Sequence, residues 1–314
     1  MKHRAWKKDF HYPTCLLLIQ SDTHIAKCLC SETKLVRARD EDRNTPLHEA
    51  ARNGHTDVIR ILIQNDARVN ERGQFDQTAL HCACQEGQLS CIQELMTHGA
   101  QIEAKTTVTG VTALHLAAIY HPDSVKILIE NYNAEVNARS LCGDTPLHVA
   151  IYGDNVSVIA VLASYKDCDV NARNNIDRTA LHLACQHRHV ACIHELMKHG
   201  AELEAGDDIG STPLHLSVTS NHAEGVKVLI DTYGASINAA NKRGDTPLHL
   251  AAAAGYTDMV ELLTSYPRCE FKAKNKSIVS TVQAAEQAGH TAIAEYLTSL
   301  RDDSGRSIFF IRSE

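Results

Sequence analysis

One tetrapeptide recurs along the chain with an almost constant spacing. Thr-Pro-Leu-His or Thr-Ala-Leu-His begins at seven threonines, and consecutive copies are separated by 33 or 34 residues. The copies start at Thr45, Thr78, Thr112, Thr145, Thr179, Thr212 and Thr246. A fixed period of this length predicts a solenoid built from stacked repeats. Because the motif is present seven times, it does not mark a single active site.

The local chemistry of each repeat predicts two helices followed by a turn. Thr is a favourable N-cap and Pro is tolerated at the first helical position, so the motif opens a helix. A second apolar stripe follows at helical spacing, as in Val58, Ile59, Leu62 and Ile63. Segments rich in Asn, Asp and Gly then predict a turn or short hairpin. The glycines expected to end the first helix in a left-handed conformation are Gly54, Gly87, Gly255 and Gly289.

These units resemble ankyrin repeats. The stretches TPLHEAARNGHTDVIRILIQNDARVNER (45–72) and TPLHLAAAAGYTDMVELLTSYPRCEFKAK (246–274) follow the ankyrin pattern closely, and the match covers residues 40–300. The resemblance implies a fold dominated by α-helices, a repeat solenoid of helix-turn-helix units joined by β-hairpin or turn fingers. It also implies that the protein binds other proteins on the concave side, which is formed by finger tips and the solvent face of the first helices.

The repeat pattern divides the chain into four segments. Residues 1–39 form a basic N-terminal segment with a degenerate capping repeat, residues 40–279 hold the seven repeats, and residues 280–300 form a C-terminal capping repeat. Terminal repeats of a solenoid expose one face to water and carry more polar residues there. Residues 301–314 are a tail whose SIFFI sequence is expected to fold back on the last helix, with a docking segment as the alternative.

A longer period of about three repeats is superimposed on the short one. The units beginning at Thr78 and Thr179 agree at 17 of 27 positions, whereas the neighbouring units at Thr78 and Thr112 agree at 8 of 27. We infer that a three-repeat block was duplicated. Such a history suits a lengthened binding surface better than a single catalytic pocket.

Composition restricts the classes of function. The net charge of the 314 residues is −7, which argues against general nucleic-acid binding. No apolar run approaches the roughly 20 residues that span a bilayer, and no signal-peptide pattern is present. We therefore expect an intracellular protein, cytoplasmic or nuclear, whose eleven cysteines are mostly reduced and which is monomeric on its own.

The nineteen histidines invite a metal or catalytic interpretation, but their positions favour a structural one. The resemblance implies that the motif histidines form hydrogen bonds within and between repeats, and they are His48, His81, His115, His148, His182, His215 and His249. The cluster Cys185, His187, His189, Cys192 and His194 offers zinc-type ligands, yet both cysteines fall on buried helix positions. We expect no metal, no cofactor and no catalytic site. The acidic residues Glu202, Glu204, Asp207 and Asp208 are expected to be solvated in a turn.

The candidate partner-binding residues are those expected on the concave side. Counted from each threonine, the fifth, eighth and ninth residues should point there, and exposed tyrosines beside apolar residues are typical of interface hot spots. This set comprises Leu116, Ile119, Tyr120, Val149 and Tyr152, flanked by Gln85, Glu86, Gln186 and His187. The alternative is that Ile119 and Tyr120 only cover the gap between two stacked repeats.

A second candidate stripe lies on the finger tips, three or four residues before each threonine. These fingertip residues are Phe75, Val108, Leu141, Ile176 and Ile209. They either hold neighbouring fingers in line or contact the partner. Four asparagines just ahead of the tips, Asn70, Asn137, Asn171 and Asn238, are expected to form finger hydrogen bonds, and the resemblance adds hydroxylation as an alternative role.

Three classes of function follow. The leading hypothesis is a non-catalytic protein–protein interaction module, acting as an intracellular adaptor, scaffold or regulator. The second is binding to an anionic membrane or a nucleic acid through Lys2–Lys8 and Lys27–Arg39, since residues 1–39 hold eight Lys and Arg against three Asp and Glu. The third is an enzyme with an unrecognised site.

Overall fold

The structure is a computed structural model that describes residues 36–300, and this part of the chain is built from pairs of short helices. The chain divides into two compact units between Asp169 and Val170, and each unit is described by itself. The capping repeat predicted within residues 1–39, except its last four residues, and the tail with its SIFFI sequence lie outside the described residues.

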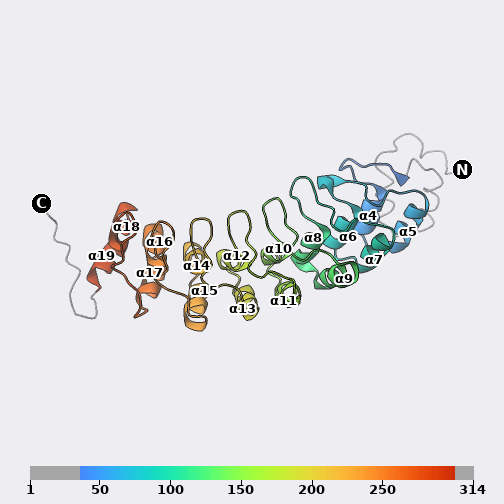
Figure 1. The fold of residues 1–314 in the computed structure, drawn as a ribbon. Coiled ribbons are helices and arrows are strands. Elements are labelled where there is room, and N and C mark those ends of the chain that lie inside the picture. Colours follow the sequence, from blue (N-terminus) through green and yellow to red (C-terminus); the bar gives the residue numbers. More distant parts are fainter. Residues whose placement is uncertain (1–35, 301–314) are drawn as a thin grey trace. The chain divides into compact units, whose positions relative to one another are not determined.

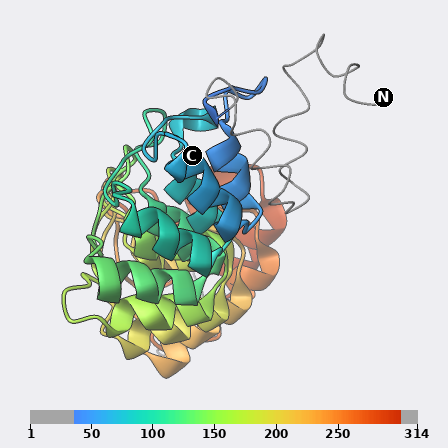
Figure 2. The same cartoon turned by 90° about the vertical axis from the view of Figure 1, so that its right-hand side faces the viewer.

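Within residues 36–169, the first unit contains four helical pairs. Figures 1 and 2 show these short helices stacked side by side. The first helices of the pairs pack in the order α4, α6, α8 and α10, and the second helices in the order α5, α7, α9 and α11. A short 3-10 helix, η1 (Gln74–Asp76), precedes α6. The helix bounds are α4 Pro46–Arg52, α5 Thr56–Gln64, α6 Ala79–Gln85, α7 Leu89–Thr97, α8 Ala113–Tyr120, α9 Pro122–Tyr132, α10 Pro146–Tyr152 and α11 Val156–Ser164.

The second unit repeats this arrangement (Figure 1). Its first helices pack in the order α12, α14, α16 and α18. The π-helical turn η2 (Val228–Thr232) continues α15 directly. The helix bounds are α12 Ala180–His187, α13 Val190–Lys198, α14 Pro213–Thr219, α15 Ala223–Lys227, α16 Pro247–Ala254, α17 Thr257–Thr264, α18 Thr281–Gln287 and α19 Thr291–Ser299.

The predicted helix boundaries follow from the local chemistry of the motif. Every first helix begins directly after its motif threonine, or after Ser280 in the last repeat, and this N-cap residue has an extended backbone. The four glycines expected at the ends of first helices, Gly54, Gly87, Gly255 and Gly289, have φ values between 67° and 83°. The prediction of a helical repeat solenoid is confirmed.

Leucine and alanine of the motif form the core together with apolar residues of the second helices. In the first repeat, Leu47, Ala50, Val58, Ile59 and Leu62 are all at most 2% exposed. A single helical pair leaves one side of this apolar layer open, so the next pair covers it. Stacking therefore follows from the burial of these side chains.

The finger preceding each motif threonine is a turn. Within residues 36–300 the backbone forms no β-ladder longer than the single bridge between Lys274 and Ser280. Of the two finger forms that the resemblance implied, the described fingers therefore take the turn form.

A side-chain acceptor five residues before the N-cap closes most of these turns. The Oδ1 atoms of Asn174, Asn241 and Asn275 each accept two backbone N–H groups of their own finger at 2.9–3.1 Å. Asp207 occupies the same position and accepts from the N–H groups of Ile209 and Ser211 at 3.2 and 2.8 Å.

The expectation that Asp207 is solvated is wrong. Its side chain is fully buried, because the carboxylate closes its finger and also lies 3.4 Å from Nε of Arg178. Glu202, Glu204 and Asp208 are exposed, as expected.

Adjacent fingers are joined by backbone hydrogen bonds near their tips. Leu141 N donates to Thr109 O at 2.9 Å in the first unit. In the second unit, Asp208 N donates to Ile176 O at 3.1 Å, Lys242 N to Ile209 O at 2.9 Å and Lys276 N to Arg243 O at 2.9 Å. Since the backbone makes these links, the fingertip side chains are left outside them.

Gly153 permits a close approach between two neighbouring first helices. A Cβ atom at this position would lie 2.2 Å from the carbonyl oxygen of Ile119, which is a backbone atom that has no room to move. The backbone of Gly153 has φ −84° and ψ −4°, so conformation alone does not demand glycine there. The end of α10 therefore lies directly against the end of α8.

We predict that Gly153→Ala lowers the free energy of unfolding by about 1–3 kcal/mol, the usual cost of overpacking. Alanine at an ordinary helical end would otherwise be neutral or stabilising, since it restricts the unfolded chain. The urea midpoint of unfolding measures the change. Ser220→Ala, at the equivalent position of α14, is the control and should shift the midpoint little. An equal midpoint for Gly153→Ala and wild type would show that the two helix ends do not touch.

Candidate partner-binding surface

The motif histidines are buried, and each contacts the N-cap threonine of its own helix. In each of the seven, Nδ1 accepts the backbone N–H of the N-cap threonine at 3.1–3.2 Å and lies 2.8–2.9 Å from its Oγ1. An Nδ1 atom that accepts a backbone N–H carries no proton, so the neutral ring holds its proton on Nε2. The histidines are His48, His81, His115, His148, His182, His215 and His249.

Nε2 of six of these rings reaches the finger of the next repeat. The distance to a backbone carbonyl oxygen 29 or 30 residues further along the chain is 2.9–3.2 Å. The accepting carbonyls belong to Gln77, Val111, Asp144, Ser211, Asp245 and Val279. The same residue thus caps its own helix and fixes the next finger.

Burial favours the neutral form of six of these rings. Burial lowers the pKa of His81, His115 and His182 to about 4. The hydrogen bond to the carbonyl oxygen raises the pKa and offsets only part of this effect. Burial also lowers the pKa of His48, His215 and His249. A neutral Nε2–H donor is what the bridge to the carbonyl requires.

A second interaction between repeats comes from the four asparagines ahead of the finger tips. Nδ2 of Asn70 donates to Gly99 O at 3.0 Å, and its Oδ1 accepts Gln101 N at 2.8 Å. Asn137, Asn171 and Asn238 make the same pair of bonds to the following repeat. At this position Glu103 and Glu204 use a carboxylate to accept one N–H group of the next repeat, at 2.8 and 2.7 Å.

The cysteines and histidines considered as zinc ligands do not converge. Cys185 and Cys192 are buried in α12 and α13, and burial raises the pKa of Cys185 to about 12. The ring of His187 stacks on His189 with centroids 6.0 Å apart, while His194 Nδ1 lies 2.7 Å from the Tyr233 hydroxyl. Within residues 36–300, no group of three His, Cys, Asp or Glu side chains is arranged to hold a metal ion.

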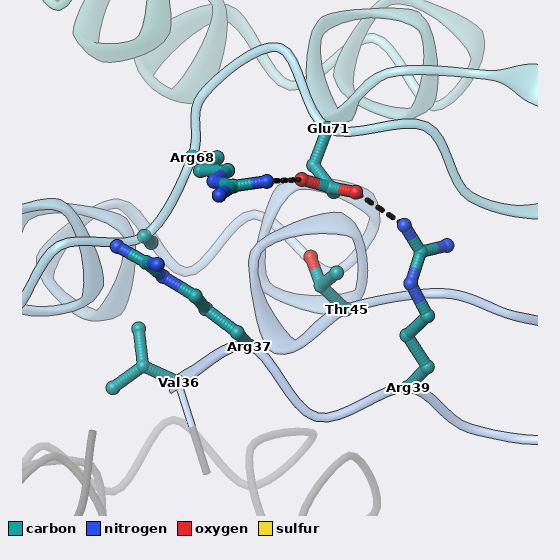
Figure 3. Close-up of a pocket in the computed structure, with 7 residues that line it drawn as sticks. Val36, Arg37, Arg39, Thr45, Arg68 and Glu71 are labelled. Atoms are coloured by element: carbon teal, nitrogen blue, oxygen red, sulfur yellow. Dashed lines mark hydrogen bonds and ion pairs between the residues drawn. The ribbon is translucent and has the colours of Figure 1, made fainter. Parts of the chain in front are cut away.

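The last residues of the basic N-terminal segment line a cavity of about 240 Å³ (Figure 3). Arg39 pairs with Glu71 and donates to Arg72 O at 2.8 Å, and Arg68 lies 3.6 Å from the same carboxylate. Nε of Arg37 donates to Asp66 O at 3.0 Å. These two cations of the segment, Arg37 and Arg39, are therefore engaged by the protein itself. The segment's other cations lie outside the described residues.

The candidate residues at the ends of the first helices vary in exposure. Tyr120 is 60% exposed and Tyr152 is 49% exposed, whereas Leu116, Ile119 and Val149 are half-buried. Since Gly153 packs against Ile119, the two tyrosines lie on adjacent helix ends. The flanking residues Gln85, Glu86, Gln186 and His187 are exposed at the ends of α6 and α12.

Two of these flanking residues also hold a finger. Gln77 Nε2 donates to Gln85 Oε1 at 3.2 Å, and Arg178 Nη1 donates to Gln186 Oε1 at 2.7 Å. The two pairs are separated by one three-repeat block and occupy matching positions. They connect the base of a finger to the end of the helix that follows it.

The fingertip residues are exposed without exception. The exposed fractions run from 44% to 72%, and the residues are Phe75, Val108, Leu141, Ile176 and Ile209. Ile278, in the finger before α18, is also 71% exposed and was not among the sequence candidates. Ile278 lies two residues before its N-cap residue Ser280, whereas the other fingertip residues lie three or four residues before theirs. The spacing rule therefore did not include it.

The exposed large apolar side chains of the described chain gather on two kinds of element. Every one of them lies either in a finger or at the C-terminal end of a first helix, and none lies on a second helix. Fingers and first-helix ends therefore form the apolar surface of each unit. Exposed large apolar side chains that gather on one kind of surface indicate a protein-interaction site.

The comparisons with known proteins agree with this architecture. The model of the family described as ankyrin repeats (3 copies) matches residues 6–73, 68–140, 104–174, 121–207, 167–241 and 202–275. The chain therefore belongs to the ankyrin-repeat family. Ankyrin repeats are in general non-catalytic protein-interaction modules.

Among curated proteins, the chain is similar to proteins of the Notch group. It is 34% identical over 140 residues to neurogenic locus notch homolog protein 1 of Xenopus laevis and 35% identical over 140 residues to that of Danio rerio. It is 35% identical over 140 residues to neurogenic locus notch homolog protein 2 of Homo sapiens. Each match covers 44% of this chain and 6% of the relative.

No helix of the described chain is long and apolar enough to cross a membrane.

We predict that the protein loses stability as the pH falls from 6.5 towards 4. In that range the unfolded histidines bind protons that the buried rings do not, so stability is complete above pH 6.5 and decreases below it. The slope is about 1.4 kcal/mol per pH unit for each such histidine. Urea midpoints measured between pH 7.5 and pH 4.5 give the slope.

The variant His182→Gln separates this effect from general acid destabilisation. Glutamine already stands at the equivalent position in the last repeat, where Gln283 Oε1 accepts Ser280 N at 3.0 Å. The variant keeps that bond and has no titrating ring, so its stability should fall less steeply with decreasing pH than that of the wild type. Equal slopes for the two proteins would contradict the assignment.

Proposed function

We propose that this chain is a non-catalytic adaptor, scaffold or regulator that binds a partner protein on the surface formed by its fingers and first-helix ends. The observation that carries the proposal is the confinement of exposed large apolar side chains to that surface. The second helices cover the other side and carry none of them. An intracellular location, in the cytoplasm or the nucleus, belongs to the same proposal.

In the first unit, the centre of this surface is the pair Tyr120 and Tyr152. Their rings extend from adjacent helix ends above the half-buried Leu116, Ile119 and Val149. Tyrosine combines a large apolar area with a polar tip and loses little conformational entropy when it is held. The fingertip residues Val108 and Leu141 belong to the two fingers that lead into α8 and α10.

A polar framework below these residues holds the repeats of the first unit together. The histidine bridges, the asparagine bonds and the backbone links between fingers already fix each repeat against the next. None of these bonds involves the ring of Tyr120 or Tyr152. About half of each tyrosine side chain is already exposed, so truncation should cost less stability than at a fully buried position and should leave the fold intact.

We predict that Tyr120→Ala combined with Tyr152→Ala weakens partner binding at least tenfold, because interface tyrosines of this kind contribute about 1–2 kcal/mol or more each. Partners are identified by proximity labelling with the wild-type chain and then purified. Their affinities for wild-type and variant protein are measured by calorimetry, and urea midpoints are recorded in parallel.

Tyr132→Ala, at the end of the second helix α9, is the matched control and should bind like the wild type. A clear fall in the urea midpoint of the double variant with unchanged affinity would assign the two tyrosines to packing. Turnover of a substrate by the purified chain would contradict the non-catalytic role.

A further inference from the structure

The last two fingers of the second unit differ from the others in charge. Residues 240–245 and 272–279 contain Lys242, Arg243, Lys272, Lys274 and Lys276, whereas Asp245 is their only carboxylate. All five cations are exposed. A local excess of positive charge stands out in a chain whose net charge is −7.

Three of these cations are not used by the fold. Within the described residues, Arg243, Lys274 and Lys276 form no side-chain hydrogen bond and no ion pair. Lys242 Nζ donates to Asp208 O at 2.7 Å, which holds it over the preceding finger. Asp245 is engaged by Asn275 Nδ2 at 2.7 Å and lies between the two fingers.

The backbone fixes the spacing of these cations. Lys242 N donates to Ile209 O and Lys276 N donates to Arg243 O, both at 2.9 Å, so the three finger tips are joined in sequence. Gly244 makes the second link possible, since a Cβ atom there would lie 2.6 Å from Lys276 N. The backbone positions that carry the charges are therefore held in a row, so no loop has to be ordered on binding.

Ile278, on the last finger, is both exposed and conformationally strained. Its φ is 63°, and a β-branched residue in the left-handed region is a steric outlier. The equivalent residues of the other described fingers, which share this positive φ, are Arg43, Asp76, Gly110, Gly143, Asp177, Gly210 and Gly244. Because the Ile278 side chain is 71% exposed, packing does not compensate the strain. Strain of this kind without a packing role points to a contact made by the side chain.

Small and apolar side chains lie next to the row. The first helix after the finger 240–245 is α16, which ends in the exposed small residues Ala253 and Ala254. Ile209, 47% exposed, lies at one end of the row and Ile278 at the other. The surface thus combines unpaired cations with two apolar side chains.

We propose that these fingers form a docking site for an acidic peptide segment of a partner protein, whose carboxylates pair with Arg243, Lys274 and Lys276 and whose apolar side chain contacts Ile278. The inference deepens the proposed protein-binding function and rests on it. An acidic peptide fits better than a nucleic acid, because these finger tips carry no aromatic side chain for base stacking and do carry apolar ones.

The test uses the full chain and a panel of fluorescein-labelled synthetic peptides, each of fifteen residues with six Asp or Glu and one Leu whose place varies. Binding is followed by fluorescence anisotropy at 50 and 300 mM NaCl. We expect at least one peptide to bind, its Leu→Ser version to bind several-fold more weakly, and both to weaken at the higher salt. Absence of binding by the whole panel overturns the proposal.

Charge-reversal variants locate the site. Lys274→Glu with Lys276→Glu should weaken peptide binding at least tenfold. The control Lys198→Glu with Lys227→Glu makes the same change in net charge on the second helices α13 and α15, and should bind the peptide like the wild type. An equal loss of peptide affinity in the two double variants would show that only the net charge of the protein matters, and it would overturn the proposal.

Ile278→Gly and Ile278→Asn give a readout that a purely structural role would not produce. Both relieve the left-handed strain, so the urea midpoint should rise or hold while peptide affinity falls several-fold. Unchanged affinity overturns the contact assigned to Ile278. Tighter binding of oligo(dT) or of phosphatidylserine vesicles than of any peptide would replace the acidic peptide by a nucleic acid or a membrane surface.

The two proposals fail separately. Tyr120→Ala with Tyr152→Ala should leave acidic-peptide binding unchanged, because those residues belong to the other unit. If the tyrosine variant loses its partner while no peptide of the panel binds, only the acidic site is wrong.

Discussion

The fold depends on a neutral imidazole buried between consecutive repeats. Its Nδ1 accepts the N–H of its own helix N-cap, and its Nε2–H reaches a carbonyl oxygen of the next finger, as His182 does with Thr179 and Ser211. One side chain thus couples the start of a helix to the following repeat. One ring nitrogen bonds a residue of the same repeat, and the other bonds a residue of the next repeat. The same geometry can therefore recur from one repeat to the next along the chain. This is the physical reason for the recurrent tetrapeptide.

The fingers add a second, independent set of links. A short acceptor such as Asn241 closes most of the turns, Asn238 holds the following repeat, and backbone bonds join adjacent tips. All of these groups are backbone amides or short polar side chains. Long side chains such as Lys105, Arg173 and Lys242 add hydrogen bonds to a neighbouring finger. The apolar side chains at the finger tips are exposed. Under the proposed function, these exposed apolar residues contact the partner while the polar framework holds the repeats together.

The sequence predicted the structural features that recur in every repeat, and it did not predict those that occur only once. The period of the motif predicted the helical pairs, and the glycines at positions such as Gly54 marked the helix ends correctly. Asp207 was misjudged, because composition shows an acidic turn and not the backbone N–H groups that the carboxylate accepts. The left-handed backbone of Ile278 and the backbone contact of Gly153 also leave no periodic signal. Which exposed residues contact a partner stays a prediction.

The most direct test of the central claim is the ionisation and tautomeric state of the motif histidines. Two-dimensional ¹H–¹⁵N spectra that correlate ring nitrogens with ring protons report both. The bridges predict that His81, His115 and His182, whose pKa values burial lowers to about 4, remain as the neutral Nε2–H tautomer down to pH 5. Protonation of these rings near pH 6.5, or an Nδ1–H tautomer at pH 7, would contradict the bridging role and with it the account of how the repeats are held together.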